Sequence, residues 1–342
     1  MAELKIHNYN HLKIHSQYSI CEGAVKIDDL KDFSKENELK ALALCDTVNL
    51  CGALEFSEKI SKIGTQPIIG TQINFKYGDT TGLLPLFALN EKGYKRIIEL
   101  SSLSYLKNDE LSEPHLDFEE LLMNNEGVAL FSGTINGLFG QLFDKGKFSE
   151  IKELYSKLKQ KYNNNFYIEI QRHGDQNEVG FEKVNLSISM ELEIPLIATN
   201  EVFYIDKNMY EAHDALICIK GKTYINEKNR TKFTDQHYLK NNTEMFELFD
   251  DLPEALENNY NFPFRCNFRP LFSNPILPNI SSDKGGSADE ILKKDSFEGL
   301  KEKFKKFFKI EDKDLALNEN YLKYKDRLEH ELDIIIEMKY AS

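Results

Sequence analysis

Residues 11–19 read His-Leu-Lys-Ile-His-Ser-Gln-Tyr-Ser and decide the fold class, because a short strand-like run leads directly into polar side chains. Residues 44–52, Leu-Cys-Asp-Thr-Val-Asn-Leu-Cys-Gly, and residues 67–75, Pro-Ile-Ile-Gly-Thr-Gln-Ile-Asn-Phe, repeat that layout. Enzymes built on β/α barrels carry their sites at the C-terminal ends of such strands. The repeated layout therefore predicts a barrel whose polar groups gather at one edge.

Strand patterns and helical patterns alternate along the first 220 residues. Strands are expected at residues 12–15, 41–45, 67–75, 83–89, 128–132, 166–171 and 195–199, and helices at residues 26–39, 53–63, 93–106, 148–162, 178–192 and 208–219. The continuous apolar run at residues 41–45 is typical of a buried parallel strand. Alternation of this kind predicts an α/β fold with a parallel sheet or barrel.

The last eighty residues have a different pattern. Residues 263–286 are rich in proline and then in serine and glycine, which predicts an extended linker. Ser287 and Glu290 have the spacing of a capping box and predict a helix start, and another helix is expected from Asn318. We therefore expect a barrel domain with its closing helices at 1–262, a linker at 263–286 and a truncated helical region at 287–342.

The bulk composition excludes some classes of protein. The net charge of −13 argues against a protein that grips nucleic acid with its whole surface. The five cysteines form no paired framework and no C-x-x-C motif, and no signal core is present. No apolar run approaches the roughly 20 residues of a membrane helix. These features predict a reduced, cytoplasmic protein that does not meet a membrane.

The first strand carries three side chains on one face, because side chains alternate with period two. These are His11, Lys13 and His15. Two imidazoles on one strand face would suit a metal ion, but the ammonium group of Lys13 has no lone pair and would repel one. His15 is therefore either a metal ligand or a hydrogen-bonded histidine at a strand end.

Other candidate ligands carry the same kind of ambiguity. Glu22 is either a ligand or an ordinary turn carboxylate, and Asp46 is either a ligand or a cap for the turn before the next helix. Gln72 offers an amide where a carboxylate would bind metal better, and Thr47 is a poor ligand for a borderline metal.

Two further positions lie later in the chain. His173 follows the sixth expected strand and Glu201 follows the seventh, so both are plausible ligands. Phe203, two residues beyond Glu201, cannot bind a metal. No P-loop, dinucleotide-binding glycine motif or nucleophile elbow is present in the sequence.

These motifs, together with Pro67–Gln72, Asn90–Tyr94, Ala198–Asn200 and Ala212–Leu216, resemble one known family. It is the PHP (polymerase and histidinol phosphatase) domain of the bacterial C-family replicative polymerases, the DNA polymerase III alpha subunits. The resemblance runs along essentially the whole chain, with no exonuclease insertion inside the PHP region. It implies a distorted seven-stranded (β/α)7 TIM-like barrel, followed by a helical extension toward the polymerase palm and thumb.

The resemblance also implies up to three metal ions at the strand ends. In metal-active relatives the first strand supplies His-x-His, whereas here Lys13 takes the first place and His15 keeps the second. Glu22 matches the acidic ligand that follows, and His173 matches the histidine after the sixth strand. Elsewhere the family's ligand positions read Asp46-Thr47, Gln72, Leu83, Thr134 and Glu201-Val202-Phe203. The residual ligand candidates are His15, Glu22, Asp46, His173 and Glu201, with Lys13, Thr47, Gln72, Leu83, Thr134 and Phe203 as degenerate positions.

The implied function is that of the N-terminal PHP module of a replicative DNA polymerase. We expect a catalytically inactive scaffold that docks the proofreading exonuclease (epsilon) subunit and stabilises the polymerase core of the same chain. No cofactor is expected in this chain beyond a residual Zn, Mn or Mg ion at the PHP site. Mg is the cofactor expected for the full-length polymerase, whose palm aspartates lie beyond residue 342. The alternative is a metal-dependent phosphoesterase or 3'-5' exonuclease of PHP type. DNA is expected to bind the full-length protein. Within this chain, the basic stretch Lys301–Lys309 is either a solvated helix face or a local DNA contact.

Overall fold

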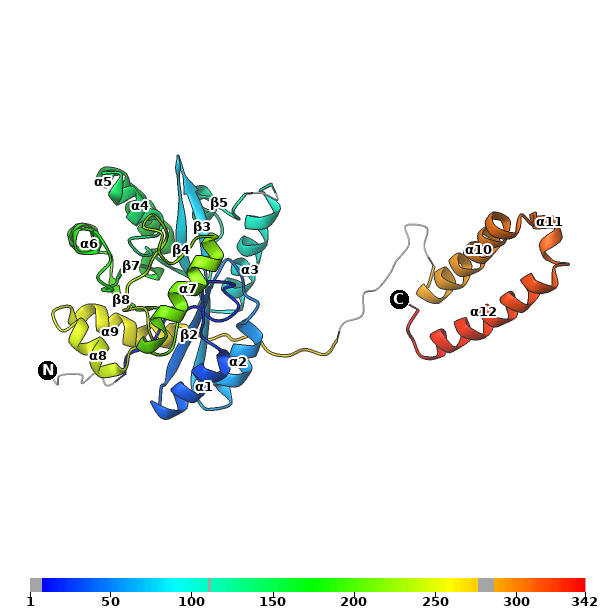
Figure 1. The fold of residues 1–342 in the computed structure, drawn as a ribbon, viewed down its shortest axis with the longest axis horizontal. Helices are drawn as coiled ribbons and strands as arrows, with labels where there is room; N and C mark the ends of the chain where they lie inside the picture. Colours follow the sequence, from blue (N-terminus) through cyan, green and yellow to red (C-terminus); the bar gives the residue numbers. More distant parts are fainter. Residues whose placement is uncertain (1–7, 110–111, 276–285, 342) are drawn as a thin grey trace. The chain divides into compact units, whose positions relative to one another are not determined.

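The computed structural model describes residues 8–109, 112–275 and 286–341. By its internal contacts the chain divides into two units, residues 1–272 and residues 273–342, which are described separately. The first unit is a curled sheet wrapped by helices, and the second is a pair of long helices with a short one between them (Figure 1).

The sheet of the first unit closes on itself through one bent segment. Its order is β8-β7-β6-β4-β3-β2-β1-β9, with β5 beside β3. The strands are β1 (Lys13–Ile14), β2 (Ala41–Thr47), β3 (Gln66–Tyr77), β4 (Thr80–Ala88), β5 (Leu116–Asp117), β6 (Val128–Phe131), β7 (Phe166–Ile170), β8 (Leu196–Ala198) and β9 (Glu201–Val202). β8 pairs with β7, and β9, which follows it after a short bend, pairs with β1. Taken as one strand, β8 and β9 complete a seven-stranded barrel, which confirms the expected fold class.

One strand runs against the expected parallel arrangement. β4 is antiparallel to both of its neighbours, β3 and β6. Only Gly78 and Asp79 separate β3 from β4, and a parallel crossover needs a dozen or more residues. The expectation of a parallel sheet or barrel is therefore wrong at β4, because the chain between β3 and β4 is long enough only for a hairpin turn.

Helices cover the outside of the barrel (Figure 1). In this unit they are α1 (Ile27–Glu36), α2 (Ala53–Ser61), α3 (Glu91–Leu106), α4 (Leu138–Asp144), α5 (Phe148–Tyr162), α6 (Glu178–Leu192), α7 (Tyr210–Gly221), α8 (Asn242–Leu248) and α9 (Pro253–Asn261), with short 3-10 turns at Phe118–Leu122, Asn163–Asn165, Lys207–Met209 and Phe262–Arg265. Side chains of α1 and α2, such as Leu30 and Phe56, pack on the outer face of β2. The expected strands and long helices are confirmed, with shifts of a few residues at their ends.

The interior of the barrel is apolar below the strand ends. Inward side chains of β2, β4, β6 and β7 meet Phe262, which enters from the 3-10 turn after α9. The Phe262 ring centroid lies 5.5 Å from that of Phe87 and 5.1 Å from that of Phe131. This packing leaves the opposite, carboxyl-terminal end of the barrel for polar side chains.

Residues that follow α9 run along the first unit as far as Phe272. The amide of Asn267 donates to the carbonyl of Leu89, and the hydroxyl of Ser57 donates to the carbonyl of Pro270. The expected linker at 263–286 thus includes a stretch held by hydrogen bonds to its backbone, while residues 276–285 of it lie outside the described residues. The expected domain boundaries stay predictions.

The second unit consists of α10 (Ala288–Phe308), α11 (Asp312–Leu315) and α12 (Glu319–Glu337). Ser287 and Glu290 form the expected capping box, and Asn318 caps α12 by accepting from the amide of Tyr321. Phe304, Leu315 and Tyr321 form a small buried cluster between the helices. The predicted starts of both long helices are confirmed.

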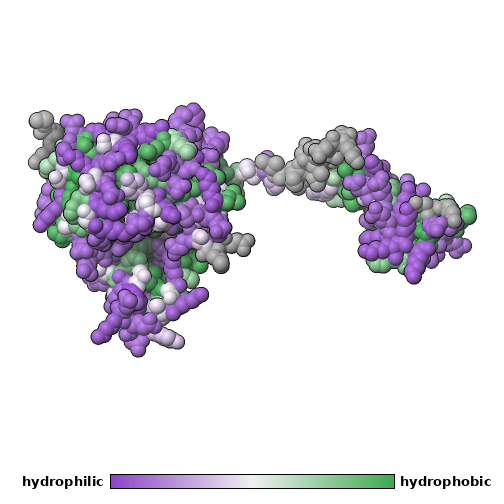
Figure 2. Space-filling model, turned by 90° about the horizontal axis from the view of Figure 1, so that it is seen from above, coloured by the Kyte–Doolittle hydropathy of each residue, from purple (hydrophilic) through white to green (hydrophobic). Residues whose placement is uncertain are grey.

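The surface gives no sign of a bilayer-crossing segment. Across residues 8–109, 112–275 and 286–341, no helix is both long and apolar enough to span a membrane. On the face in Figure 2 hydrophilic residues predominate, with hydrophobic residues in smaller groups between them. The five cysteines are all free, as expected for a chain without a disulfide framework.

Candidate functional site

Five polar side chains meet inside the barrel at the carboxyl ends of its strands. They come from β1 and its end, β3, β7 and β9, and are Lys13, His15, Gln72, Glu169 and Glu201. All are buried, although four carry or can carry a charge. Side-chain alternation explains part of the gathering. Gln72 and Glu169 share the parity of Ile68 and Tyr167, apolar residues of the barrel interior on the same strands.

Lys13 lies at the centre of this group as a buried cation. Its Nζ is 3.2 Å from Oε1 of Glu201 and 3.4 Å from Oε1 of Glu169, and its side chain is 0% exposed. Burial alone would lower the pKa of Lys13, but the two carboxylates outweigh it and raise that pKa. Burial likewise opposes ionisation of Glu201, yet Lys13 and His15 hold its pKa well below the usual value. Lys13 is therefore an ammonium ion paired with carboxylates.

His15 is linked to both sides of the site by hydrogen bonds. The amide of Gln72 donates to Oε1 of Glu201 at 2.7 Å and lies 2.9 Å from Nε2 of His15. Nδ1 of His15 is 3.3 Å from the hydroxyl of Thr47, which donates to Oε1 of Glu22 at 3.1 Å. Nε2 of His15 also lies 3.2 Å from Oε1 of Glu201. His15 thus connects Gln72 and Glu201 on one side of the site with Thr47 on the other.

Glu22 lies at the mouth of the barrel and is already well supplied with partners. Oε2 of Glu22 is 2.8 Å from Nζ of Lys220, near the end of α7. Its backbone carbonyl is 2.9 Å from Nε2 of His213, also in α7. Glu22 thus joins the loop after β1 to α7 and, through Thr47, to His15.

Asp46 serves the loop after β1. Its carboxylate accepts from the amide and hydroxyl of Ser16 at 2.6 and 2.9 Å, and from the hydroxyl of Ser19 at 2.7 Å. Burial raises the pKa of Asp46, and these hydrogen bonds oppose that rise. One interpretation of the sequence was a cap for the turn before the next helix, whereas the groups bound by Asp46 belong to the preceding loop.

The remaining sequence-predicted positions lie around this group. Phe203 is buried and its ring stacks on His15, with centroids 4.6 Å apart. Leu83 lines a surface pocket of about 540 Å³ together with Glu22 and Thr47. The hydroxyl of Thr134 accepts from the amide of Asn136 at 3.1 Å. Phe203, Leu83 and Thr134 offer no strong metal donor.

His173 stands beside Glu201 rather than in the Lys13 group. Its Nε2 lies 3.1 Å from Oδ1 of Asn200 and 3.2 Å from the amide of Glu201. Its backbone amide donates to the carboxylate of Glu178. The structure thus brings His15, Glu22 and Glu201 into one hydrogen-bonded network and links His173 to it through the backbone of Glu201.

Comparison with known proteins identifies the barrel. Residues 11–173 match the PHP domain family. The chain contains a PHP domain. It is 34% identical to DNA polymerase III subunit alpha of Caulobacter vibrioides, over 99% of this chain and 30% of the relative. It is 37% identical to the subunit of the same name from Rickettsia conorii, over 97% of this chain and 28% of the relative. The chain spans less than a third of the length of these relatives, and the resemblance seen in the sequence is confirmed.

A solved structure also shows a likeness to this chain. An amidohydrolase from Chromobacterium violaceum matches with a TM-score of 0.41 and 9% identity, over 61% of this chain and 97% of that chain.

The side chains of this PHP domain do not fit the cluster of up to three metals that the family resemblance implies. Lys13 brings a positive charge and no lone pair to the first ligand position, and it is paired with Glu201. Gln72 turns its amide nitrogen, not its oxygen, toward His15 and Glu201. The donors that remain already hold each other by hydrogen bonds.

Two residues in or beside the PHP site escaped sequence reasoning. Glu169 is the one charged residue in the apolar strand Phe166–Ile170. A charged residue at an inward-facing position of such a strand could have indicated that Glu169 belongs to the site. Its Oε1 accepts from Gln171 at 2.8 Å and also from the hydroxyl of Thr199. His237 lies in the irregular segment between α7 and α8, where no periodicity marks a position.

Acid should destabilise the PHP domain through its buried histidines. Burial lowers the pKa of His11 to about 4, although its Nε2 is 2.8 Å from the carbonyl of Lys240. Unfolded histidine binds a proton near pH 6.5, so the unfolded state binds more protons between pH 6.5 and 4, and stability falls as the pH falls. From pH 7 to 4, His11 alone should cost about 3 kcal/mol.

Urea unfolding at a series of pH values measures this effect. His11→Gln keeps an N–H donor but cannot be protonated, so its loss of stability from pH 7 to 4 should be smaller by about 3 kcal/mol than that of the parent. The exposed His330 on α12 supplies the control His330→Gln, which should follow the parent. Equal pH dependence in parent and His11→Gln would show that His11 is protonated alike in both states.

Proposed function

We propose that this chain is the N-terminal part of a replicative DNA polymerase alpha subunit and that its PHP barrel is a catalytically inactive scaffold. The relatives that match 97–99% of the chain are DNA polymerase III alpha subunits, which supports a replicase context. In that context, polymerisation with Mg at palm aspartates belongs to a part of the polymerase beyond residue 342, and DNA is met through that full-length protein. The proposed localisation is cytoplasmic.

The buried Lys13–Glu201–Glu169 ion pair carries this proposal. A lysine ammonium at the first ligand position places a positive charge between two carboxylates and so reduces their repulsion, which is part of the structural role that a metal would otherwise have there. It supplies no Lewis acid and no activated water, the two means by which a metal hydrolyses phosphoesters. A barrel stabilised in this way can remain folded without metal-dependent hydrolysis of phosphoesters.

The proposed partners follow from the replicase context. The scaffold would hold the proofreading exonuclease (epsilon) subunit and pack against the polymerase core of its own chain. Retention of a closed barrel with a well-packed interior is what such a docking role needs, since a binding surface depends on a rigid support.

A binding assay with the cognate exonuclease subunit tests the docking role. We expect both this chain and the full-length polymerase to form a complex with that subunit in size-exclusion chromatography and in biolayer interferometry. Loss of stoichiometric binding in both forms would refute docking. Binding by the full-length protein alone would place the docking surface outside this chain and so would also contradict the proposal.

A nuclease assay separates the scaffold from the alternative, a PHP-type phosphoesterase or 3'-5' exonuclease. The chain is incubated with a 3'-labelled oligonucleotide and with p-nitrophenyl phosphate, in the presence of Mn or Zn. We expect no turnover above that of His15→Ala prepared in the same way. Turnover that the parent shows and His15→Ala lacks would establish the phosphoesterase and overturn the inactive scaffold.

A further inference from the structure

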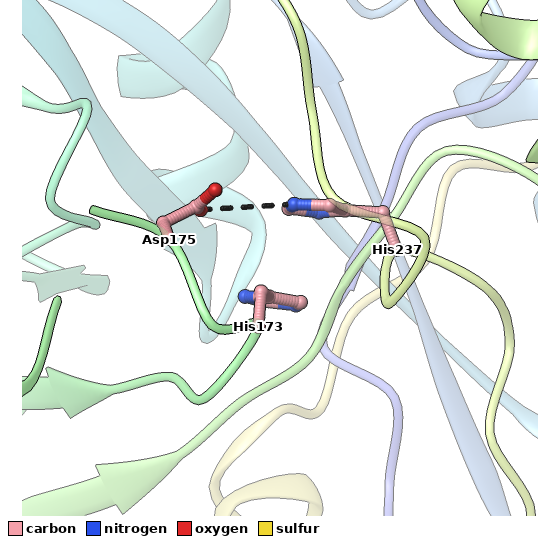
Figure 3. Close-up of side chains that lie close together, drawn as sticks. All are labelled: His173, Asp175 and His237. Atoms are coloured by element: carbon pink, nitrogen blue, oxygen red, sulfur yellow. Dashed lines mark ion pairs between the residues drawn. The ribbon is translucent and has the colours of Figure 1, made fainter.

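A second group of potential ligands lies beside the PHP site, on loops rather than on strand ends. His173 and Asp175 belong to the loop between β7 and α6, and His237 comes from the segment between α7 and α8 (Figure 3). One donor atom from each residue lies within 4.8 Å of the other two. Asp175 and His237 occupy positions for which the family resemblance implies no ligand.

Two nitrogen atoms in this group are buried without a hydrogen bond. Among the described residues, neither Nδ1 of His173 nor Nε2 of His237 has a hydrogen-bond partner, although both residues are at least 98% buried. An unpartnered buried polar atom costs about 1–3 kcal/mol, a cost that a bound cation would offset at both nitrogens. Nδ1 of His173 lies 3.6 Å from Oε1 of Glu178. Nε2 of His237 lies 3.8 Å from Oδ2 of Asp175, and Figure 3 shows that it points toward that carboxylate.

Hydrogen bonds on the far side of each ring bear on which nitrogen can bind a cation. Nδ1 of His237 donates to the carbonyl of Glu201 at 3.1 Å, which leaves a lone pair on Nε2. Oδ1 of Asn200 faces Nε2 of His173 and is held as an acceptor, because Nδ2 of Asn200 donates to the carbonyl of Tyr238. The amide of Glu201 also lies 3.2 Å from this Nε2 and donates to it when the proton is on Nδ1. A cation at Nδ1 therefore selects the other tautomer, in which Nε2 donates to Asn200 and Nδ1 carries the lone pair. Ligating histidines are oriented by such partners in known metal sites.

We propose that His173, Asp175 and His237 form a mononuclear site for a borderline divalent cation such as Zn²⁺, with water completing a tetrahedral set. Two imidazoles and one carboxylate are a donor set that zinc uses. The ion would tie the β7–α6 loop to the segment before α8, and so would act as a structural clamp beside the Lys13 ion pair. The site goes beyond the scaffold role and does not depend on exonuclease docking.

The geometry requires one adjustment on binding. The rings of His173 and His237 are stacked, with centroids 4.0 Å apart and planes 5° apart. A nitrogen lone pair lies in the plane of its ring, so the rings must tilt for both lone pairs to meet one ion. Asp175 supplies a carboxylate to the site, and the nearby Nζ of Lys240 is held by Oδ1 of Asn200 at 3.1 Å.

Metal titration of the chelator-stripped chain tests the site. Zn²⁺ is added at pH 7.5 in competition with a chromophoric chelator, and Co²⁺ is added separately to observe its visible absorption. We expect one equivalent bound and a higher thermal midpoint with Zn²⁺, since a ligand that binds only the folded state stabilises it. Asp175→Asn and His237→Gln should each weaken binding by at least the roughly 10–100-fold that loss of an outer-shell partner costs.

Matched controls decide where the ion binds. Glu22→Gln removes a carboxylate from the PHP site, and His330→Gln removes an exposed histidine on α12, so both should bind Zn²⁺ as the parent does. If His237→Gln does not fold, Asp175→Asn still tests the site, because Asp175 is partly exposed on a loop. The proposal is overturned if no Zn²⁺ binds, if Asp175→Asn binds as tightly as the parent, or if Glu22→Gln abolishes binding.

Discussion

Replacement of Lys13 by methionine should lower the free energy of unfolding by about 3–5 kcal/mol, the usual result of removing one partner from a buried ion pair. Methionine keeps an unbranched stem but no charge. The side chains of Glu169 and Glu201, 0% and 9% exposed, would then share the barrel interior without a cation. The loss should be larger at pH 8 than at pH 5, because protonation of a carboxylate relieves the unpaired charge.

Lys220→Met is the matched control for Lys13→Met. Nζ of Lys220 also lies close to a carboxylate, 2.8 Å from Oε2 of Glu22, but its side chain is 51% exposed. An exposed pair contributes only about 0–1 kcal/mol, so this control should unfold almost as the parent does. Urea denaturation of the three proteins measures the difference. Equal stability of Lys13→Met and the parent would mean that the buried ammonium is not needed to neutralise Glu169 and Glu201.

Truncation of Phe262 to alanine should cost about 3–5 kcal/mol of unfolding free energy, as for other large aromatic side chains in cores. Phe262 is fully buried at the apolar end of the barrel. Its ring contacts those of Phe87, Phe131 and Tyr167, with centroids 5.1–5.8 Å apart. Removal of the ring leaves a cavity between four strands that the closed barrel cannot easily collapse.

Phe264→Ala provides the comparison for Phe262→Ala within the same 3-10 turn. Phe264 is 76% exposed, and a surface substitution of this kind usually changes stability by less than about 0.5 kcal/mol. Thermal or urea unfolding of the pair separates loss of the buried ring from any effect on the turn itself. If both variants lost the same stability, the turn rather than the interior packing would be responsible.

The sequence predicted the elements of the barrel well because its local signals are strong. Apolar runs such as Ala41–Cys45 and amphipathic stretches such as Phe148–Tyr162 determine strand and helix by composition and period. It did not predict that β4 runs antiparallel, since strand direction depends on the length of the Gly78–Asp79 connection rather than on the strand itself. The bend that divides the last strand into β8 and β9 was likewise not predicted, because it depends on how that strand pairs with both β7 and β1 to close the barrel.

The candidate site was predictable in part. The shared face of Lys13 and His15, and the positions of Gln72 in the third expected strand and of Glu201 after the seventh, follow from the strand pattern. The partner of Lys13 across the barrel, Glu169, was missed because pairing between distant strands is not visible in local sequence. His237 was missed for a related reason, since it reaches His173 only through the fold of an irregular segment.

We infer that a lysine ion pair has taken the place of the metal cluster in the PHP site. The metal content of Asp175→Asn, which lacks the proposed separate site, tests this inference after loading with Mn or Zn and desalting. We expect much less than one ion per chain by elemental mass spectrometry. Retention of two or three ions per chain, lost again in Asp175→Asn/Glu201→Gln, would contradict it.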